Sequence, residues 1–405
     1  LPDTVENRSV HIHYLIVLGP VLLRLEGSTA RATRDLYEQA IELCDRLPEP
    51  EQQFKAIWGQ WQAAPDYRKE QGGAYTANLS HLAERINDPE VKLQLHHHQW
   101  ATLFYQGQFS RVLDHAEAGL GAFAGAVQRD NADFGHDPMV CARGFQGLAH
   151  WFMGNTGRAL EEAEASYRAA RQQNRSDSLI NAILHNLNLA TMSKETEGIA
   201  RWTQELDEIC SEVSMPELKG RLDFSRGLLK MHADSPGGTD QMLSSLEQIR
   251  SIGTNESIAM FNELIAEALL GEDRMAEAEL LIDETLALYD LYCFDFWKAE
   301  VYRRKGHICM LRGDKKSSLD WFIRAYRLAR EQAALSLQLR AALSLARYHE
   351  CFGGYPEGLE LLNKVCERFT PESESRELKQ ARRVMGQRVE SPARLPGENS
   401  PRYTI

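Results

Sequence analysis

The chain has 405 residues, of which 26% are charged and 43% apolar, and its formal net charge is −12. This composition is typical of a soluble globular chain, and the charge excludes a general binder of nucleic acid or anionic membranes, which needs a basic surface. A single compact core does not normally reach this length, whereas a repeat protein can, because each repeat packs only on its neighbours.

The seven cysteines are scattered along the chain, and none lies in a CxxC pair. A disulfide framework or a zinc motif shows closer, paired spacing. We therefore expect buried, reduced thiols and a reducing compartment, which favours a cytoplasmic location.

No stretch of the sequence is long and apolar enough to cross a membrane. The short apolar run 14–18 lacks the basic leader and the cleavage site of a signal peptide. The chain begins at Leu1 in the middle of a helical pattern. We interpret it as a fragment of a longer protein, with residues 1–8 as the junction to a missing upstream domain.

A helix–turn–helix pattern recurs about every 40 residues and is clearest from Tyr302 to Ala325. The expected hairpins, in chain order, span about 9–46, 50–86, 90–126, 139–173, 178–212, 216–250, 255–289, 295–330 and 335–369. We expect Gly19 and Pro20 to kink or break the first helix. The pattern predicts an all-α, right-handed α-solenoid over residues 9–371, a capping helix over 372–386 and an extended tail over 387–405.

Small residues are expected where the two helices of a hairpin cross, because a larger side chain would separate the backbones. Gly147, Gly306 and Ala346 occupy these crossings. In the facing helices, Ala159, Ala276 and Ser318 lie opposite the crossings, and Leu280, Phe322 and Leu362 fill the space below.

Five segments carry a resemblance to a known family: 35–44, 57–61, 101–109, 300–306 and 336–347. They resemble lengthened tetratricopeptide repeats. More narrowly, they are similar to the C-terminal repeats of bacterial proteins with a class III adenylate/guanylate cyclase or protein kinase domain and an AAA/STAND-type ATPase. The resemblance covers most of 10–385 and implies that the catalytic and nucleotide-binding domains lie upstream. The chain departs from it at the linker 128–138 and the turn 234–238.

Motifs for catalysis are missing from the sequence. The turn 313–317 lacks the glycine that a phosphate-binding loop needs before its lysine. Successive helical residues point about 100° apart, so the three adjacent histidines 96–98 cannot converge on one ion. Without a nucleophile motif either, we expect no enzymatic activity, no cofactor and no metal site in this chain.

The first helix of each hairpin is expected to line the concave face, as the tetratricopeptide resemblance implies. The predicted partner-binding residues are His97, Phe104, Trp151, His185, Met192, Phe261, Arg303, His307, Arg340 and Arg347. Aromatic, Met and Arg side chains often anchor interfaces, and we expect Arg303 and Arg347 to be solvent-exposed. The strip grades from aromatic to basic, which suits a protein or peptide with an apolar segment and an acidic end. The alternative is that these residues pack against neighbouring helices.

Two functional hypotheses follow. The first is a non-catalytic interaction and sensing module that binds a protein or peptide and regulates upstream cyclase or kinase and ATPase domains, including by intramolecular contact with them. The second is a small-molecule sensor of a STAND-type regulator, and a stand-alone scaffold is a further alternative. A closed apolar pocket near Trp151 and His185 would favour the small-molecule sensor, and an open groove the interaction module.

Overall fold

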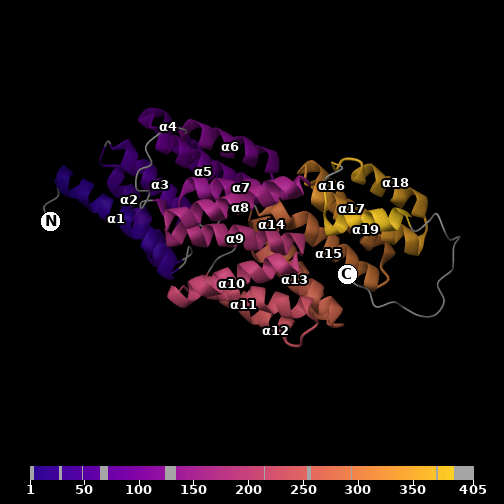
Figure 1. Cartoon of the computed structure of the whole chain (residues 1–405). Helices are drawn as coiled ribbons and strands as arrows, with labels where there is room; N and C mark the ends of the chain where they lie inside the picture. The colour runs from indigo at the N-terminus through magenta and orange to yellow at the C-terminus, as the bar shows by residue number, and fades with distance from the viewer. Residues whose placement is uncertain are drawn as a thin grey trace. The chain divides into compact units, whose positions relative to one another are not determined.

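The computed structural model describes residues 4–26, 30–47, 49–63, 72–123, 134–213, 215–252, 257–292, 294–370 and 373–386. Within these ranges the chain forms nineteen α-helices (Figure 1). They are α1 (Val5–Glu26), α2 (Arg31–Cys44), α3 (Pro50–Ala63), α4 (Gly72–Ile86), α5 (Pro89–Tyr105), α6 (Phe109–Phe123), α7 (Pro138–Phe152), α8 (Thr156–Gln173), α9 (Ser176–Ser193), α10 (Thr196–Glu212), α11 (Pro216–His232), α12 (Gly238–Ile252), α13 (Ile258–Gly271), α14 (Met275–Leu291), α15 (Lys298–Leu311), α16 (Lys315–Glu331), α17 (Leu335–Phe352), α18 (Tyr355–Cys366) and α19 (Arg376–Gly386).

Each helix packs chiefly on helices that are close to it in the chain. The pairs α5–α6, α9–α10, α11–α12, α15–α16 and α17–α18 form hairpins, and contacts such as α10–α11 and α16–α17 join successive hairpins. The order of the helices gives nine hairpins and a last helix, α19. The predicted all-α, tetratricopeptide-like hairpin architecture is therefore confirmed.

The chain separates into two compact units. The first contains Leu1–His150, Arg158–Ile258 and Leu288–Phe296, and the second contains Trp151–Gly157, Ala259–Ala287 and Trp297–Ile405. None of the described helices has the combination of length and apolar character that crossing a membrane requires. The predicted tail 387–405 and most of the predicted linker, 128–133, lie outside the described residues.

The helix crossings follow the expected chemistry in the eighth hairpin. A Cβ atom added to Gly306 would lie 2.6 Å from the ring of Phe322, which is fully buried. The hydroxyl of Ser318 donates a hydrogen bond to the Gly306 carbonyl oxygen over 2.9 Å. Because any side chain at position 306 would displace this ring, glycine is what lets α15 and α16 approach.

One local prediction was wrong and a second was wrong in part. Leu280 is 63% exposed and Ala276 is exposed, and the buried positions of α14 include Ala278 and Ile282 instead. The helical face was therefore assigned to the wrong residues in the seventh hairpin. Of the expected kink or break at Pro20, the break does not occur, because α1 is continuous through this residue.

The final helix, α19, completes the core of the ninth hairpin. Its Leu378 and Ala381 are buried against a cluster that includes Leu339 and Ala346 of α17 and Leu362 of α18. Most other side chains of α19 are exposed or half-buried, and many are charged. The helix therefore covers an apolar surface and presents a polar one.

Candidate functional site

A cavity of about 330 Å³ opens in the first unit, and each helix that contributes to its wall is the first helix of a hairpin. These helices are α1, α3, α5, α7, α9 and α11. The lining residues are Leu23, Trp61, Gln62, His97, Ala101, Tyr105, His136, Cys141, Phe145, Asn181, Leu184, His185, Asn188, Glu217, Arg221 and Ser257.

The wall takes one residue from each of five successive hairpins at an even spacing in the sequence. Trp61, Ala101, Cys141, Asn181 and Arg221 follow one another at intervals of 40 residues, and all five line the cavity. Trp61 and Ala101 lie near the C-terminal ends of α3 and α5, whereas Cys141, Asn181 and Arg221 lie in the N-terminal halves of α7, α9 and α11. The side chains at these five positions are an indole, a methyl group, a thiol, an amide and a guanidinium, so the wall combines five different side-chain types.

His97 and His185 are the two predicted site residues that line this cavity. Both are buried, and His185 packs over Gly144, where an added Cβ would lie 2.6 Å from its Nδ1. Burial, and then the neighbouring His136, lowers the pKa of His97 well below its ordinary value and that of His185 to about 3. Both imidazoles are therefore neutral near pH 7 and offer a lone pair.

Several polar residues of the wall were missed by the sequence prediction. Asn181, His185 and Asn188 share one face of α9, and the side-chain oxygen Oδ1 of Asn181 is buried without a hydrogen-bond partner among the described residues. On α11, Arg221 pairs with Glu217 over 3.2 Å. The signal was available, because Asn181 and Asn188 lie four and three residues from the predicted His185, which is helical spacing.

Phe104 and Met192 are buried in the first unit and do not line the cavity. The ring of Phe104 lies 5.2 Å from that of Phe145 and 5.3 Å from that of Phe296. Phe104 belongs to an aromatic cluster that supports the wall, which agrees with the packing alternative.

Trp151 and Phe261 belong to the second unit, and both are buried. The ring of Trp151 stacks on that of Trp297 with centroids 6.2 Å apart, and the guanidinium of Arg340 lies 5.3 Å from the Trp151 ring. Trp151 is therefore packed between other side chains. Trp151 and His185 lie in different units.

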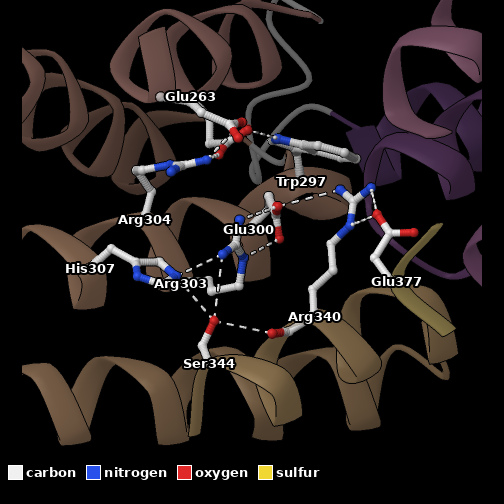
Figure 2. A network of polar contacts seen from close by, with 10 residues as sticks. Glu263, Trp297, Glu300, Arg303, Arg304, His307, Arg340, Ser344 and Glu377 are labelled. Atoms are coloured by element: carbon white, nitrogen blue, oxygen red, sulfur yellow. Dashed lines mark hydrogen bonds and ion pairs between the residues drawn. The ribbon is translucent and has the colours of Figure 1, made fainter. Parts of the chain in front are cut away.

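Arg303 and Arg340 take part in a buried polar network of the second unit (Figure 2). Arg303 donates to both carboxylate oxygens of Glu300 over 2.7 and 2.9 Å, and Arg340 reaches Glu300 over 3.3 Å and Glu377 over 2.5 Å. Burial alone would lower the pKa of Arg303, but Glu300 outweighs it and raises that pKa. The expectation that Arg303 is solvent-exposed was therefore wrong.

The same network continues onto α13 (Figure 2). Arg304, fully buried, pairs with Glu263 over 2.6 Å and with Glu267 over 2.9 Å, and the indole of Trp297 donates to Glu263 over 3.3 Å. Each buried charge thus has a partner, which is the condition for tolerating it in a core.

His307 and Arg347 lie beside Arg303 but differ in what they bind. His307 accepts a hydrogen bond from Arg303 over 2.8 Å and lies 3.1 Å from the hydroxyl of Ser344. Arg347 is half-buried and forms no ion pair with any described residue, and burial, followed by Arg303, lowers its pKa. Of the three predicted arginines, Arg347 is the one without an ion pair among the described residues.

No protein-family model matches the chain. An uncharacterized protein of Rhizobium meliloti (strain 1021) is 26% identical over 353 residues, which are 85% of this chain and 34% of that protein. The chain therefore spans about a third of the length of this relative.

Two solved structures share the fold. A crystal structure of a Rap protein complexed with competence and sporulation factor matches with a TM-score of 0.62 and 8% identity, covering 90% of this chain and 98% of that one. The apo form of the quorum sensor NprR from B. thuringiensis matches with a TM-score of 0.51 and 13% identity, covering 90% and 99%. The chain is thus a tetratricopeptide-like helical repeat protein that is similar in fold to these two.

Proposed function

We propose that the chain is a non-catalytic sensing module that binds a short peptide, or a peptide segment of a protein, in the cavity of the first unit. The observation that carries this proposal is the buried Oδ1 atom of Asn181, which has no hydrogen-bond donor among the described residues. An unsatisfied buried acceptor costs about 1–3 kcal/mol. A ligand with an N–H group supplies the missing donor.

The rest of the wall suits a peptide backbone. A carboxamide both donates and accepts hydrogen bonds, as a peptide group does, and Asn181 and Asn188 present two of them on one helix face. Tyr105 and Phe145 offer aromatic surface to an apolar side chain, and the paired side chains of Glu217 and Arg221 add polar atoms to the wall. This combination supports a ligand with a polar backbone and an apolar side chain.

The two similar structures support a sensing role. The Rap protein was crystallised with competence and sporulation factor, and NprR is a quorum sensor. Their likeness to this chain concerns the fold, and the ligand of this chain is our proposal.

We further propose that residues 9–371 act as the repeat region of a longer signalling protein, capped by 372–386, and regulate cyclase or kinase and ATPase domains. The sequence resemblance supports this proposal, as does a relative of which the chain spans about a third. Within this proposal, the ligand changes the contact between repeats and upstream domains.

A small-molecule ligand is the second candidate, and the volume of the cavity favours it. Small-molecule pockets measure about 300–1,000 Å³, and this cavity, at about 330 Å³, falls at the lower end.

The test is a binding measurement with pools of fluorescent short peptides on the purified chain. Asn181→Leu and Asn188→Leu should each lower the affinity for the selected peptide by about tenfold or more, equivalent to about 1.4 kcal/mol. Asn363→Leu is the matched control, because Asn363 is exposed on α18. Peptide binding that both cavity variants retain would contradict the proposed site. If no peptide binds but small metabolites raise the melting temperature, the second candidate is favoured.

A further inference from the structure

Two histidines and a cysteine meet at the wall of the same cavity. The ligand atoms of His97, His136 and Cys141 all lie within 4.8 Å of one another. His97 and Cys141 are buried on α5 and α7, and His136 is half-buried just before α7. Two imidazoles and a thiol are a donor set that suits Zn²⁺ and similar borderline cations, and the lack of a carboxylate disfavours Mg²⁺ and Ca²⁺.

The orientation of His97 is fixed so that its lone pair faces the cysteine. Its Nδ1 lies 3.0 Å from Oε1 of Gln94, which can only accept, so Nδ1 carries the proton. The other nitrogen, Nε2, then points its lone pair at Sγ of Cys141 over 3.3 Å. A tetrahedral Zn²⁺ site with ordinary bond lengths separates such a nitrogen and sulfur by about 3.6 Å. A hydrogen bond from the second imidazole nitrogen to an outer residue is the usual arrangement for a metal-binding histidine.

Aromatic packing holds this imidazole in place. The ring of His97 stacks on Trp100 with centroids 5.0 Å apart and meets the edge of Trp58 at 5.3 Å. Little freedom remains to be lost when His97 binds a ligand, which is the preorganisation that a metal site needs.

His136 is positioned by the residues on either side of it. Phe134 packs on Trp58 with centroids 5.0 Å apart, and the Gly135 carbonyl accepts a hydrogen bond from Arg175 over 3.1 Å. Asp137 is buried and accepts from the backbone N–H groups of Met139 and Val140, so it caps the start of α7. With both neighbours anchored, the His136 ring lies 5.0 Å from that of His97.

We propose that His97, His136 and Cys141 form a binding site for Zn²⁺ or a similar transition-metal cation at the wall of the cavity. The metal replaces the thiol proton of Cys141: the S–H bond breaks, the proton passes to solvent and a metal–sulfur bond forms. Three protein ligands leave a coordination position open, and the neighbouring cavity lets water or a ligand group reach it. This site does not depend on the peptide proposal, because it needs no peptide to form.

The sequence prediction of no metal site rested on the three adjacent histidines, which do diverge. His96 faces His115 over 3.1 Å, and His98 lies 2.9 Å from the Thr76 hydroxyl. Only His97 turns toward Cys141, which is 44 residues further along the chain. Motif spacing cannot reveal such a cluster, because its members come from different hairpins.

The test uses the full chain, reduced and freed of metal by a chelator, with Co²⁺ as the probe and Zn²⁺ as the competitor. We expect one equivalent of Co²⁺ to give thiolate-to-cobalt charge-transfer absorption and tetrahedral d–d bands, both of which Zn²⁺ removes. Binding of Zn²⁺ should release about one proton. Cys141→Ser should abolish the charge-transfer band, and Gln94→Leu should weaken metal affinity by about 10- to 100-fold.

Two variants serve as controls. Cys44→Ser removes a cysteine that packs in an apolar cluster of α1–α3, and His115→Ala removes the separate histidine pair, so both should keep the cobalt spectrum. Wild-type protein without the charge-transfer band, or Cys141→Ser protein with it, would overturn the proposal. Should Cys141→Ser fail to fold, His136→Asn decides, because this residue lies outside the helices, and an unaltered spectrum there also overturns the site. Peptide binding is measured separately in chelator, so either proposal can fail alone.

Discussion

Arg303 on α15 and Arg347 on α17 both belong to the second unit, and charge reversal should lower the stability of the protein much more at Arg303 than at Arg347. Arg303→Glu places a carboxylate beside the buried Glu300, and breaking such a pair costs about 3–5 kcal/mol. Arg347 has no ion-pair partner among the described residues, and Arg303 disfavours its charge, so Arg347→Glu should cost about 1 kcal/mol or less. Urea unfolding of both variants measures the difference.

Binding separates the same two residues. If an acidic partner binds at Arg347, the Arg347→Glu variant should stay folded and bind this partner more weakly. The affinity of the wild type for the partner should fall with added salt. Equal loss of stability in the two variants would show that Arg347 is structural as well.

For single residues, the sequence predicted the contacts of a glycine better than the solvent exposure of an arginine. Gly306 and Phe322 meet as expected, because a crossing of two helices constrains the size of both residues. The burial of Arg303 could not be predicted, since it depends on Glu300 and on Arg340 of the next hairpin. Helical spacing shows that Glu300 can pair with Arg303, but it does not show that Arg340, from the next hairpin, joins this pair in a core.

At the scale of elements, His307 joins three helices and should make the second unit sensitive to acid. On α15 it faces Arg303 and Arg304, with Glu300 nearby; it also meets Phe322 of α16, and Ser344 and Arg347 of α17. Burial, followed by these arginines, lowers its pKa well below 6.5 in the folded chain. Just below pH 6.5, His307 therefore binds a proton in the unfolded chain but not in the folded chain, and stability falls as the pH drops below about 6.5.

The expected slope from this one group is at most about 1.4 kcal/mol per pH unit. Melting temperatures between pH 7 and pH 5 should fall less steeply for His307→Gln than for the wild type, because glutamine can still accept from Arg303 and does not titrate. Identical pH profiles would mean that His307 takes up its proton without unfolding.

Helix pairing was predictable for a physical reason, and the cavity was not. The helix–turn–helix pattern repeats about every 40 residues, and each hairpin buries its apolar faces locally, so sequence spacing reports it directly. The wall of the cavity takes residues from the first helices of five consecutive hairpins, such as Ala101, Cys141 and Asn181, whose chemistry differs each time. The spacing was visible, but nothing marked that register as the one facing a cavity. In α14 the apolar residues extend around the helix, which is why Leu280 was assigned to the wrong face.

At the scale of the whole molecule, the repeat pattern does not mark the division into two units. The residues of α7 are divided between the units after His150, and those of α14 after Ala287. The repeat pattern assigns each helix as a whole to one hairpin, so it cannot predict a unit boundary that falls within a helix. The binding role of the ten predicted residues stays a prediction, which the peptide and metal experiments address for the first unit.

The polar network of the second unit has a consequence for how this part of the chain opens. Repeat proteins usually exchange their amide hydrogens hairpin by hairpin, since each repeat contacts only its neighbours. Here Glu300 on α15 forms an ion pair with Arg340 on α17, and Arg340 forms a second ion pair with Glu377 on α19. If one of these helices unfolds alone, an ion pair is broken and a charged side chain loses its partner.

We therefore expect amides of α15, α17 and α19 to exchange with deuterium through one common opening, with a single dependence on denaturant. Glu300→Gln should divide that opening into separate steps, whereas Glu331→Gln, on the exposed face of α16, should leave it whole. Mass-resolved hydrogen exchange reads both outcomes from the same peptides, and independent exchange in the wild type would contradict the coupling. With this coupling, a ligand that distorts the ninth hairpin would loosen the eighth as well, because α15, α17 and α19 would open together.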